Sequence, residues 1–501
     1  MQVTLAGVNL DMKHVDLVRR IRDEYLTEGP GSHRFDELMH SLGDDPLTPE
    51  TISAAYARIS RSERGIQELR RDAFASVNRA RRSNENIIFG LGHTSVAEHA
   101  VFNLDITGAS RLAIEDLESH RLASYTESSQ RYISHSGDYI VPDEIRSVGL
   151  ENEFDVICRG LFKAYREIDK KLETYYESPT DKEHTGKTRE DARYVLPLAC
   201  RGQVGMTINA RSAESMIRNF SQSILSEVRF LGAQMLEELR FAAPSLMRYV
   251  EPSPKFAPVE RWLRAEVART NKETSADTCQ DDVQLIEAPQ RLDRLAVAAL
   301  LFKSGESSYE AVLNYIESLD EAARTRLMRE AHRHLETHDS LRRELELGYF
   351  TYSITLSASA FAQLKRHRMA TLIKQDYLPE LGVTIPTAVQ DANLTAEFNQ
   401  AILSSEWLYT KLTRLLDDSH QPAASYILTN AHRRRVIFQA NARELTHLSR
   451  LRLDQSAQWD IRRLVNEIIA QARNACPVLL MFACGKDEFE GVVGGLMRGK
   501  S

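Results

Sequence analysis

A chain of 501 residues exceeds what one hydrophobic core usually supports, and at about 150 residues per domain it predicts two to four units. Its 42% hydrophobic and 27% charged residues exclude wholesale disorder. The net charge of −7 excludes a general attraction to nucleic acid or to anionic membranes, so we expect neither as a partner.

The cysteines and the hydropathy pattern predict a cytoplasmic protein. The five cysteines form no Cys-x-x-Cys pair and show no metal-ligand spacing, so we expect buried thiols, no disulfide framework and no metal site. The N-terminal segment lacks the basic start and apolar run of a signal peptide. No segment approaches the about 18 consecutive apolar residues that a membrane span requires.

Amphipathic helices dominate the predicted structure. Apolar residues recur at three- and four-residue steps in four segments, residues 52–82, 153–177, 212–241 and 444–475. The polar stretch 178–191 lacks this periodicity and predicts a mobile surface loop. A second polar stretch, residues 252–284, predicts the junction between two halves of the chain.

Two short segments alternate apolar and polar residues instead. They are Phe102–Thr107 and Phe350–Ser357, and period-two alternation is typical of a half-buried strand. Each predicted strand is followed by a short helical segment that ends in His-Arg, at His120-Arg121 and at His367-Arg368. The same order of predicted strand, short helix and His-Arg therefore occurs in both halves of the chain.

The same ordered set of features continues in both halves. An Asn-Ala-Arg segment, at residues 209–211 and 441–443, leads in each half into a long amphipathic helix. Two copies of about 200 residues are too long a period for a solenoid, so we expect a fused pseudo-dimer with an α+β fold, in which each module packs a small sheet with several helices. The predicted bounds are 1–255 for the first module, 256–284 for the junction and 285–501 for the second module.

Several motifs of this chain resemble those of flavin-dependent thymidylate synthases. The resemblance covers roughly residues 85–245 and 335–480. The segments that carry it are Arg366-His367-Arg368, Glu127-Ser128-Ser129-Gln130-Arg131-Tyr132, His93-Thr94-Ser95-Val96-Ala97-Glu98-His99, Arg193-Tyr194-Val195-Leu196-Pro197, Asn209-Ala210-Arg211-Ser212 and Ala457-Gln458-Trp459-Asp460-Ile461-Arg462.

The resemblance implies a reaction and a set of site residues. The implied reaction is the reductive methylation of dUMP to dTMP, with FAD as bound cofactor and with NADPH and methylenetetrahydrofolate as co-substrates. The residues that it assigns to flavin binding are Arg366, His367, Arg368, Asn441, Ser95 and Glu98. Those that it assigns to the nucleotide are Glu127, Ser129, Gln130, Arg131, Arg193, Gln363 and Arg452, and Arg452 and His93 are the expected catalytic residues.

These residue types suit such ligands. Arginine's planar guanidinium makes paired, charge-assisted hydrogen bonds to phosphate and pyrophosphate oxygens. Because a reduced flavin supplies the hydride in this family, no nucleophilic cysteine is required, and the protein supplies binding and orientation.

Neither half matches the whole family pattern. The first half has Ser119 where the flavin motif begins with arginine, Asp116 where the family usually has Gln, and Phe220 at a late substrate-binding arginine. In the second half Lys374, Asp376 and Leu378 replace the Glu-x-Ser-x-Arg residues, and Ser425 falls where the first half has Arg193.

The losses in the two halves are complementary. In the family each active site lies between subunits of a tetramer, so one composite site built from both halves would keep every group, whereas the reciprocal site would lose nearly all. We therefore expect one working site per chain, and a homodimer that forms a pseudo-tetramer.

Other interpretations remain open. Gln130, where the family commonly has Gly, leaves room for a related flavin-dependent enzyme that acts on another pyrimidine nucleotide. Ser119 and Phe220 leave room for an inactive regulator that binds flavin or nucleotide. Asn441 alone would be a helix cap. The basic run 432–435, before a predicted strand at 436–438, is interpreted as a solvated loop or a phosphate-facing edge.

Overall fold

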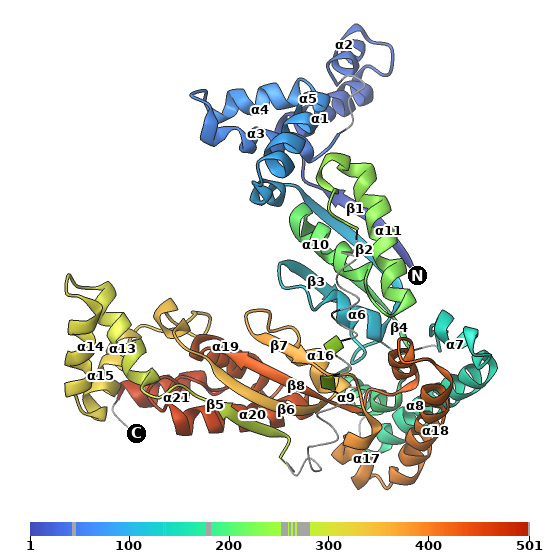
Figure 1. Cartoon of the computed structure of the whole chain (residues 1–501), viewed down its shortest axis with the longest axis vertical. Helices are drawn as coiled ribbons and strands as arrows, with labels where there is room; N and C mark the ends of the chain where they lie inside the picture. Colours follow the sequence, from blue (N-terminus) through green and yellow to red (C-terminus); the bar gives the residue numbers. More distant parts are fainter. Residues whose placement is uncertain are drawn as a thin grey trace.

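The computed structural model describes residues 1–42, 47–133, 135, 137–176, 182–251, 259, 262, 263, 266, 267 and 281–498. It contains two antiparallel sheets of four strands each (Figure 1). The first has the order β1-β2-β4-β3, and the second has the order β5-β6-β8-β7. The strands are β1 (Gln2–Val8), β2 (Val101–Ser110), β3 (Ala123–Glu127), β4 (Arg201–Asn209), β5 (Val283–Glu287), β6 (Phe350–Ser357), β7 (Thr371–Lys374) and β8 (Arg433–Ala440).

Helices surround each sheet. In the first module they are α1 (Met12–Thr27), α2 (His33–Leu42), α3 (Glu50–Ala57), α4 (Ile66–Phe74), α5 (Val77–Asn84), α6 (Arg111–Leu117), α7 (Asp143–Ser147), α8 (Glu151–Tyr175), α9 (Lys182–Ala192), α10 (Ala210–Phe220) and α11 (Ser226–Ala242). In the second they are α13 (Leu292–Lys303), α14 (Tyr309–Ser318), α15 (Glu321–Ala331), α16 (Ala358–Leu364), α17 (Thr387–Asp391), α18 (Thr395–Leu415), α19 (Ala442–Arg452), α20 (Trp459–Ala475) and α21 (Phe489–Met497).

Short 3-10 or π segments complete the modules. They are η1 (Ile59–Arg61), η2 (Glu85–Gly90), η3 (Thr94–His99), η4 (Arg193–Val195), η5 (Pro244–Leu246), η6 (Arg343–Glu346), η7 (Pro379–Leu381) and η8 (Gln421–Ile427). The repeated order of strands and helices confirms the predicted α+β fold of two modules. The predicted module bounds stay a prediction, because most of 256–284 lies outside the described residues; β5 begins at Val283, just inside the predicted junction.

The predicted strands are confirmed, whereas three of the four predicted helical segments contain more than one helix and the predicted loop is partly helical. Residues 212–241 fall in α10 and α11, and residues 444–475 fall in α19 and α20. Residues 52–82 form α3, η1, α4 and α5 rather than one helix, because Gly65 and Ser76 adopt extended backbone and begin new helices. The expected loop 178–191 is helical from Lys182 onward. Its end buries Asp191 and Ala192, so tertiary packing outweighs the weak local periodicity. Residues 178–181 lie outside the described part.

The two modules meet around a local two-fold relationship. The amide of Leu198 donates to the carbonyl of Leu428 at 2.7 Å, and the amide of Asn430 donates to the carbonyl of Leu196 at 3.0 Å. Ala199 N to Tyr426 O and Ala431 N to Tyr194 O, both at 2.9 Å, repeat this reciprocity. The two sheets extend away from this corner, where α6, α8, α16 and α18 gather (Figure 1).

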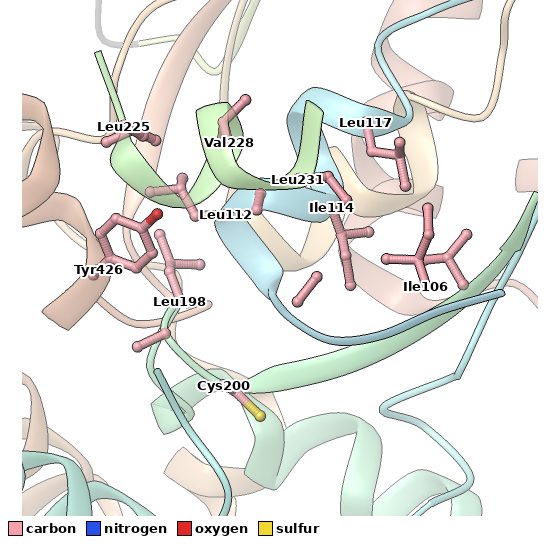
Figure 2. Close-up of a cluster of buried hydrophobic side chains, with 14 of the residues drawn as sticks. Ile106, Leu112, Ile114, Leu117, Leu198, Cys200, Leu225, Val228, Leu231 and Tyr426 are labelled. Carbon is pink, nitrogen blue, oxygen red and sulfur yellow. The ribbon is translucent and has the colours of Figure 1, made fainter. Parts of the chain in front are cut away.

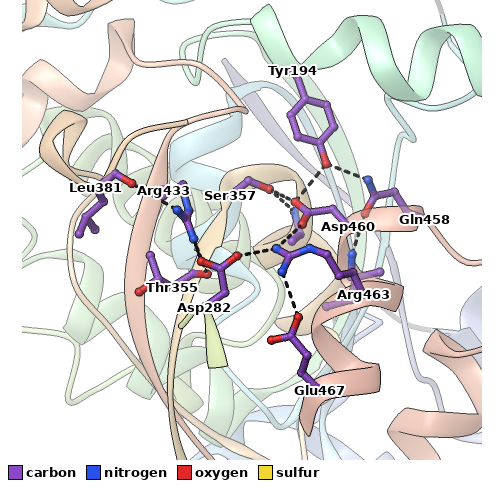
Figure 3. A network of polar contacts seen from close by, with 12 residues as sticks. Tyr194, Asp282, Thr355, Ser357, Leu381, Arg433, Gln458, Asp460, Arg463 and Glu467 are labelled. Atoms are coloured by element: carbon purple, nitrogen blue, oxygen red, sulfur yellow. Dashed lines mark hydrogen bonds and ion pairs between the residues drawn. The ribbon is translucent and has the colours of Figure 1, made fainter. Parts of the chain in front are cut away.

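Side chains repeat the same symmetry. Tyr426 of the second module lies among apolar residues of the first, including Leu198, Leu112 and Leu225 (Figure 2), and donates to the Glu227 carboxylate at 2.7 Å. At the position related by the local two-fold, Tyr194 donates to Asp460 at 3.2 Å (Figure 3). One hydrophobic core therefore continues from the first module into the second, as expected of a fused pseudo-dimer.

Candidate active site

Residues from both modules converge beside this corner. The first module contributes Glu127 at the end of β3, Ser129–Arg131 in the following loop and Arg193 at the start of η4. The second contributes Gln363 in α16, Arg366–Arg368 in the loop after it and Arg452 at the end of α19. Each group stands where a regular element ends, so the two sheets fix its position.

Glu127 is the acidic centre of the cluster. Its carboxylate pairs with Arg111, and lies 3.7 Å from Arg366 Nη2 and 3.9 Å from Lys365 Nζ of the other module. Burial alone would raise its pKa, but Arg111, Lys365 and Arg366 outweigh burial and lower the pKa to about 2. Glu127 is therefore a permanent hydrogen-bond acceptor at neutral pH.

Three guanidinium groups gather next to it. Arg452 donates through Nη1 to Gln363 Oε1, through Nη2 to the Gln363 carbonyl and through Nε to His367 Nε2, each at 3.2 Å. Burial, together with the charges of Arg366 and Arg131, lowers the pKa of Arg452 to about 10, so it stays cationic at neutral pH. Arg131 pairs with Glu190 and reaches across the module boundary to the Ser456 carbonyl at 3.2 Å. Such a concentration of positive charge favours an anionic ligand.

Arg193 and Gln130 are held by a residue of the other module. The side-chain Nδ2 of Asn430 donates to Gln130 Oε1 at 3.0 Å and to the Arg193 carbonyl at 2.9 Å. Ser129 Oγ accepts from the Arg131 amide at 3.2 Å, which shapes the loop. Arg193 is buried, its pKa is lowered mainly by burial, and its Nη2 makes no hydrogen bond. An unsatisfied buried guanidinium nitrogen indicates a ligand that completes the site.

The expected flavin residues of the second module lie on the other side of Arg452. His367 is buried and its Nδ1 lies 3.1 Å from Glu444 Oε1, and Arg368 donates to the Arg121 carbonyl at 3.3 Å. Asn441 caps α19 by accepting from the Glu444 amide at 2.9 Å. A hollow of about 400 Å³ opens beside them. Its lining includes Met369, Arg443, His447, Arg450 and Lys486.

His93, Ser95 and Glu98 lie elsewhere in the chain. They precede β2, whereas α6 follows it, and a strand of ten residues spans about 33 Å at about 3.3 Å per residue. His93 Nε2 lies 2.7 Å from Arg61 Nη2, and Glu98 pairs with Arg211 at 2.6 Å. In the described structure His93 and Glu98 therefore contact side chains of their own module.

The local two-fold relates the cluster around Glu127 to a second position, around Glu115. There the charged side chains pair with one another. Lys374 pairs with Asp116 at 2.7 Å, and Tyr377 donates to Glu115 at 2.8 Å. The guanidinium of Arg434 lies 2.9 Å from Glu115 and 3.6 Å from the centre of the Tyr377 ring, with only 2% of the residue exposed. The interpretation of 432–435 as a solvated loop is therefore wrong. β8 begins at Arg433, and Arg434 points inward because alternate residues of a strand face opposite sides.

Sequence reasoning missed several residues of the cluster. Arg111, Lys365 and Asn430 lie in no motif, and Glu444 replaces the serine of the Asn-Ala-Arg-Ser motif; the contacts of all four cross between distant segments. A position-by-position comparison of the two halves would have shown them. Asn430 aligns with Leu198, and Glu444 aligns with Ser212.

The chain matches one family model twice. The model is described as thymidylate synthase complementing protein, and the matches cover residues 42–245 and 284–478. The chain belongs to this family. The double match confirms both the resemblance seen in the motifs and the duplication.

Individual relatives divide into two kinds. Flavin-dependent thymidylate synthases match one part of the chain. That of Clostridium tetani is 35% identical over 211 residues, covering 41% of this chain and 83% of the relative, and that of Geobacter sulfurreducens is 33% identical over 212 residues with the same coverage. A Chlamydia muridarum protein named UPF0159 is 25% identical over 493 residues, covering 89% of this chain and 92% of its own length.

Two kinds of feature are absent from the described residues. Within the described ranges, no helix combines the length and apolar character needed to cross a bilayer. In the same part of the chain, no three His, Cys, Asp or Glu side chains group as metal ligands, and the four described cysteines are free and buried.

Proposed function

We propose that this chain is a flavin-dependent thymidylate synthase with one composite active site per chain. It converts dUMP, methylenetetrahydrofolate and NADPH into dTMP, tetrahydrofolate and NADP⁺. The observation that carries this proposal is the convergence of Glu127 and Arg131 of one module with Arg366 and Arg452 of the other, in a member of the thymidylate synthase complementing family.

The arginines and Glu127 divide the nucleotide between them. Arg131 and Arg193 hold the phosphate, because guanidinium groups pair with its oxygens and Arg193 Nη2 lacks a protein partner. Glu127, with Ser129, accepts hydrogen bonds from the sugar or base edge. Arg452, oriented by Gln363, faces the pyrimidine and stabilises the negative charge that develops on the ring.

The second module holds the flavin. We assign Arg366, His367, Arg368 and Asn441 to the flavin; of these, His367 contacts Arg452 and Glu444, and Asn441 caps the start of α19. The neighbouring hollow is lined by Arg443, Arg450 and Lys486, which suit a pyrophosphate, together with the carboxylates Asp339 and Glu444. FAD, once reduced by NADPH, supplies the hydride of the reaction. These residues bind and orient it next to Arg452.

A second copy of the chain completes the flavin site. Within one chain His93 contacts Arg61 and Glu98 pairs with Arg211, both of the first module. We propose that Ser95, Glu98 and His93 act in the site of a partner chain in a homodimer. His93 would then approach the reacting groups only in the dimer. A monomer with full activity would contradict this part of the proposal.

The alternative substrate has less support from the geometry. The side-chain oxygen of Gln130 accepts a hydrogen bond from Asn430, so Gln130 takes part in a contact between the two modules. Two measurements distinguish an enzyme from a regulator that binds ligands without turnover. The gene should allow a thymidine-auxotrophic bacterium to grow without thymidine, and the purified chain should show flavin absorbance. Flavin absorbance without growth, and without dTMP formation in vitro, would refute the proposal.

A further inference from the structure

Three side chains of the second module form a continuous hydrogen-bonded row. Arg452 Nε lies 3.2 Å from His367 Nε2, and His367 Nδ1 lies 3.1 Å from Glu444 Oε1. Glu444 is only 7% exposed and His367 only 3%. The row therefore runs through the protein interior, where hydrogen bonds are strong and their loss is costly.

Donor and acceptor chemistry fixes the direction of this row. Arginine Nε–H can only donate, so His367 Nε2 must accept and the imidazole must be neutral. The single proton of His367 is then on Nδ1 and points at Glu444, which as a carboxylate can only accept. Burial, the largest cause, and Arg452 both lower the pKa of His367, which agrees with a neutral ring.

A second imidazole and the start of α19 lie beside this row. His447 is the other imidazole near His367, with ring centroids 5.8 Å apart in a T-shaped arrangement. Glu444 itself is placed by local structure. It lies in the first turn of α19, where Asn441 caps the helix and where the helix dipole favours negative charge.

The first module lacks both ends of the row. There His120 takes the place of His367, but Ser212 stands at the position of Glu444 and Phe220 at that of Arg452. His120 packs edge-on against Phe220 at 5.4 Å, and its Nδ1 has no hydrogen-bond partner. The carboxylate is present in the module that keeps the arginine and absent from the module that has lost it.

We propose that Glu444 is a positioning residue for Arg452. By accepting from Nδ1 it holds His367 in the one tautomer that can receive Arg452 Nε–H. That contact turns the two terminal nitrogens of Arg452 toward Gln363 and the nucleotide. The assignment rests on the proposed function, in which Arg452 contacts dUMP.

The test is a double-mutant cycle on the full-length chain, read by dUMP affinity and by turnover. Glu444→Ser introduces the residue of the first module. It should lower dUMP affinity and kcat/KM by about 10- to 100-fold, because removal of a residue that orients a ligand-binding histidine has an effect in this range.

Glu444→Gln, which still accepts through Oε1, should recover most of this loss. In an Arg452→Lys background, which has no Nε–H donor, Glu444→Ser should change dUMP affinity less than about threefold. Ser212→Ala, at the equivalent position of the first module, is the matched control and should leave both values unchanged.

The outcomes separate three explanations. Equal losses from Glu444→Ser in both backgrounds would overturn the positioning role and indicate a structural one. Loss of flavin absorbance in Glu444→Ser, with dUMP affinity unchanged, would overturn it in favour of direct flavin contact. A wild-type chain that binds dUMP with the predicted coupling, but makes no dTMP, would refute the proposed function while supporting the role of Glu444.

Discussion

The two positions related by the local symmetry of the modules have the same backbone and opposite chemistry. Around Glu127, cations from both modules converge and Arg193 retains an unused donor. Around Glu115, the cations Lys374 and Arg434 are neutralised by carboxylates and covered by Tyr377. The first arrangement concentrates cations from both modules, whereas the second pairs Lys374 with Asp116 and Arg434 with Glu115.

Gene fusion explains how this difference can exist. In an assembly of identical subunits, both symmetry-related positions must carry the same residue. Here Lys365 and Glu118 occupy equivalent positions, both are buried, and they pair with each other at 3.0 Å. Such a pair is available only when the two copies differ in sequence, and Lys365 also helps to keep Glu127 ionised.

The largest expected effect is a loss of turnover that distinguishes the position around Glu127 from the position around Glu115. Arg131→Ala and Arg368→Ala should each lower turnover by roughly 100- to 1,000-fold, because each removes a charged donor from the proposed site. Lys374→Ala, at the position equivalent to Glu127, should leave turnover nearly intact. Steady-state assays of dTMP formation check this, and equal damage from all three would refute the division between the modules.

Substitution of Arg434 tests whether the position around Glu115 contributes to stability and not to ligand binding. Arg434→Met should lower the free energy of unfolding by about 3–5 kcal/mol, because it removes the cation that pairs with the buried Glu115. The affinity for dUMP should not change. Denaturant unfolding and calorimetry measure the two quantities, with Arg435→Met on the opposite face of β8 as control. A stable variant with weakened dUMP binding would place Arg434 in a working site instead.

Substitutions in the pair Lys365–Glu118 test whether the sequence difference between the two modules at this contact is needed for stability and for dUMP binding. Glu118→Lys alone should destabilise the fold, since it places two cations in contact in a buried position. The double swap Lys365→Glu and Glu118→Lys should recover most of the stability but weaken dUMP binding, because Glu127 would then face a carboxylate. Full recovery of both properties would show that Lys365 has no role beyond packing.

Sequence patterns predicted the parts of this molecule that depend on local order. The alternation at Phe350–Ser357 predicted β6, and the repeated order of His-Arg and Asn-Ala-Arg predicted the duplication. The convergence of Glu127 with Arg366 was also expected, because the family pattern divides those residues between subunits.

The remaining features depend on contacts between distant segments. Arg434 belongs to a basic run that is typical of a solvated loop, and only its partners Glu115 and Tyr377 explain its burial. Glu444 begins an ordinary amphipathic helix, and its contact with His367 requires the fold. Glu98 matches the family motif, yet its pairing with Arg211 is a contact that no motif reveals.

The binding stoichiometry of dUMP tests the central claim most directly. Titration calorimetry of the full-length, flavin-loaded chain should give one dUMP per chain, with binding abolished in Arg131→Ala and retained in Lys374→Ala. Two molecules of dUMP per chain, or binding that depends equally on Arg131 and Lys374, would contradict a single composite site.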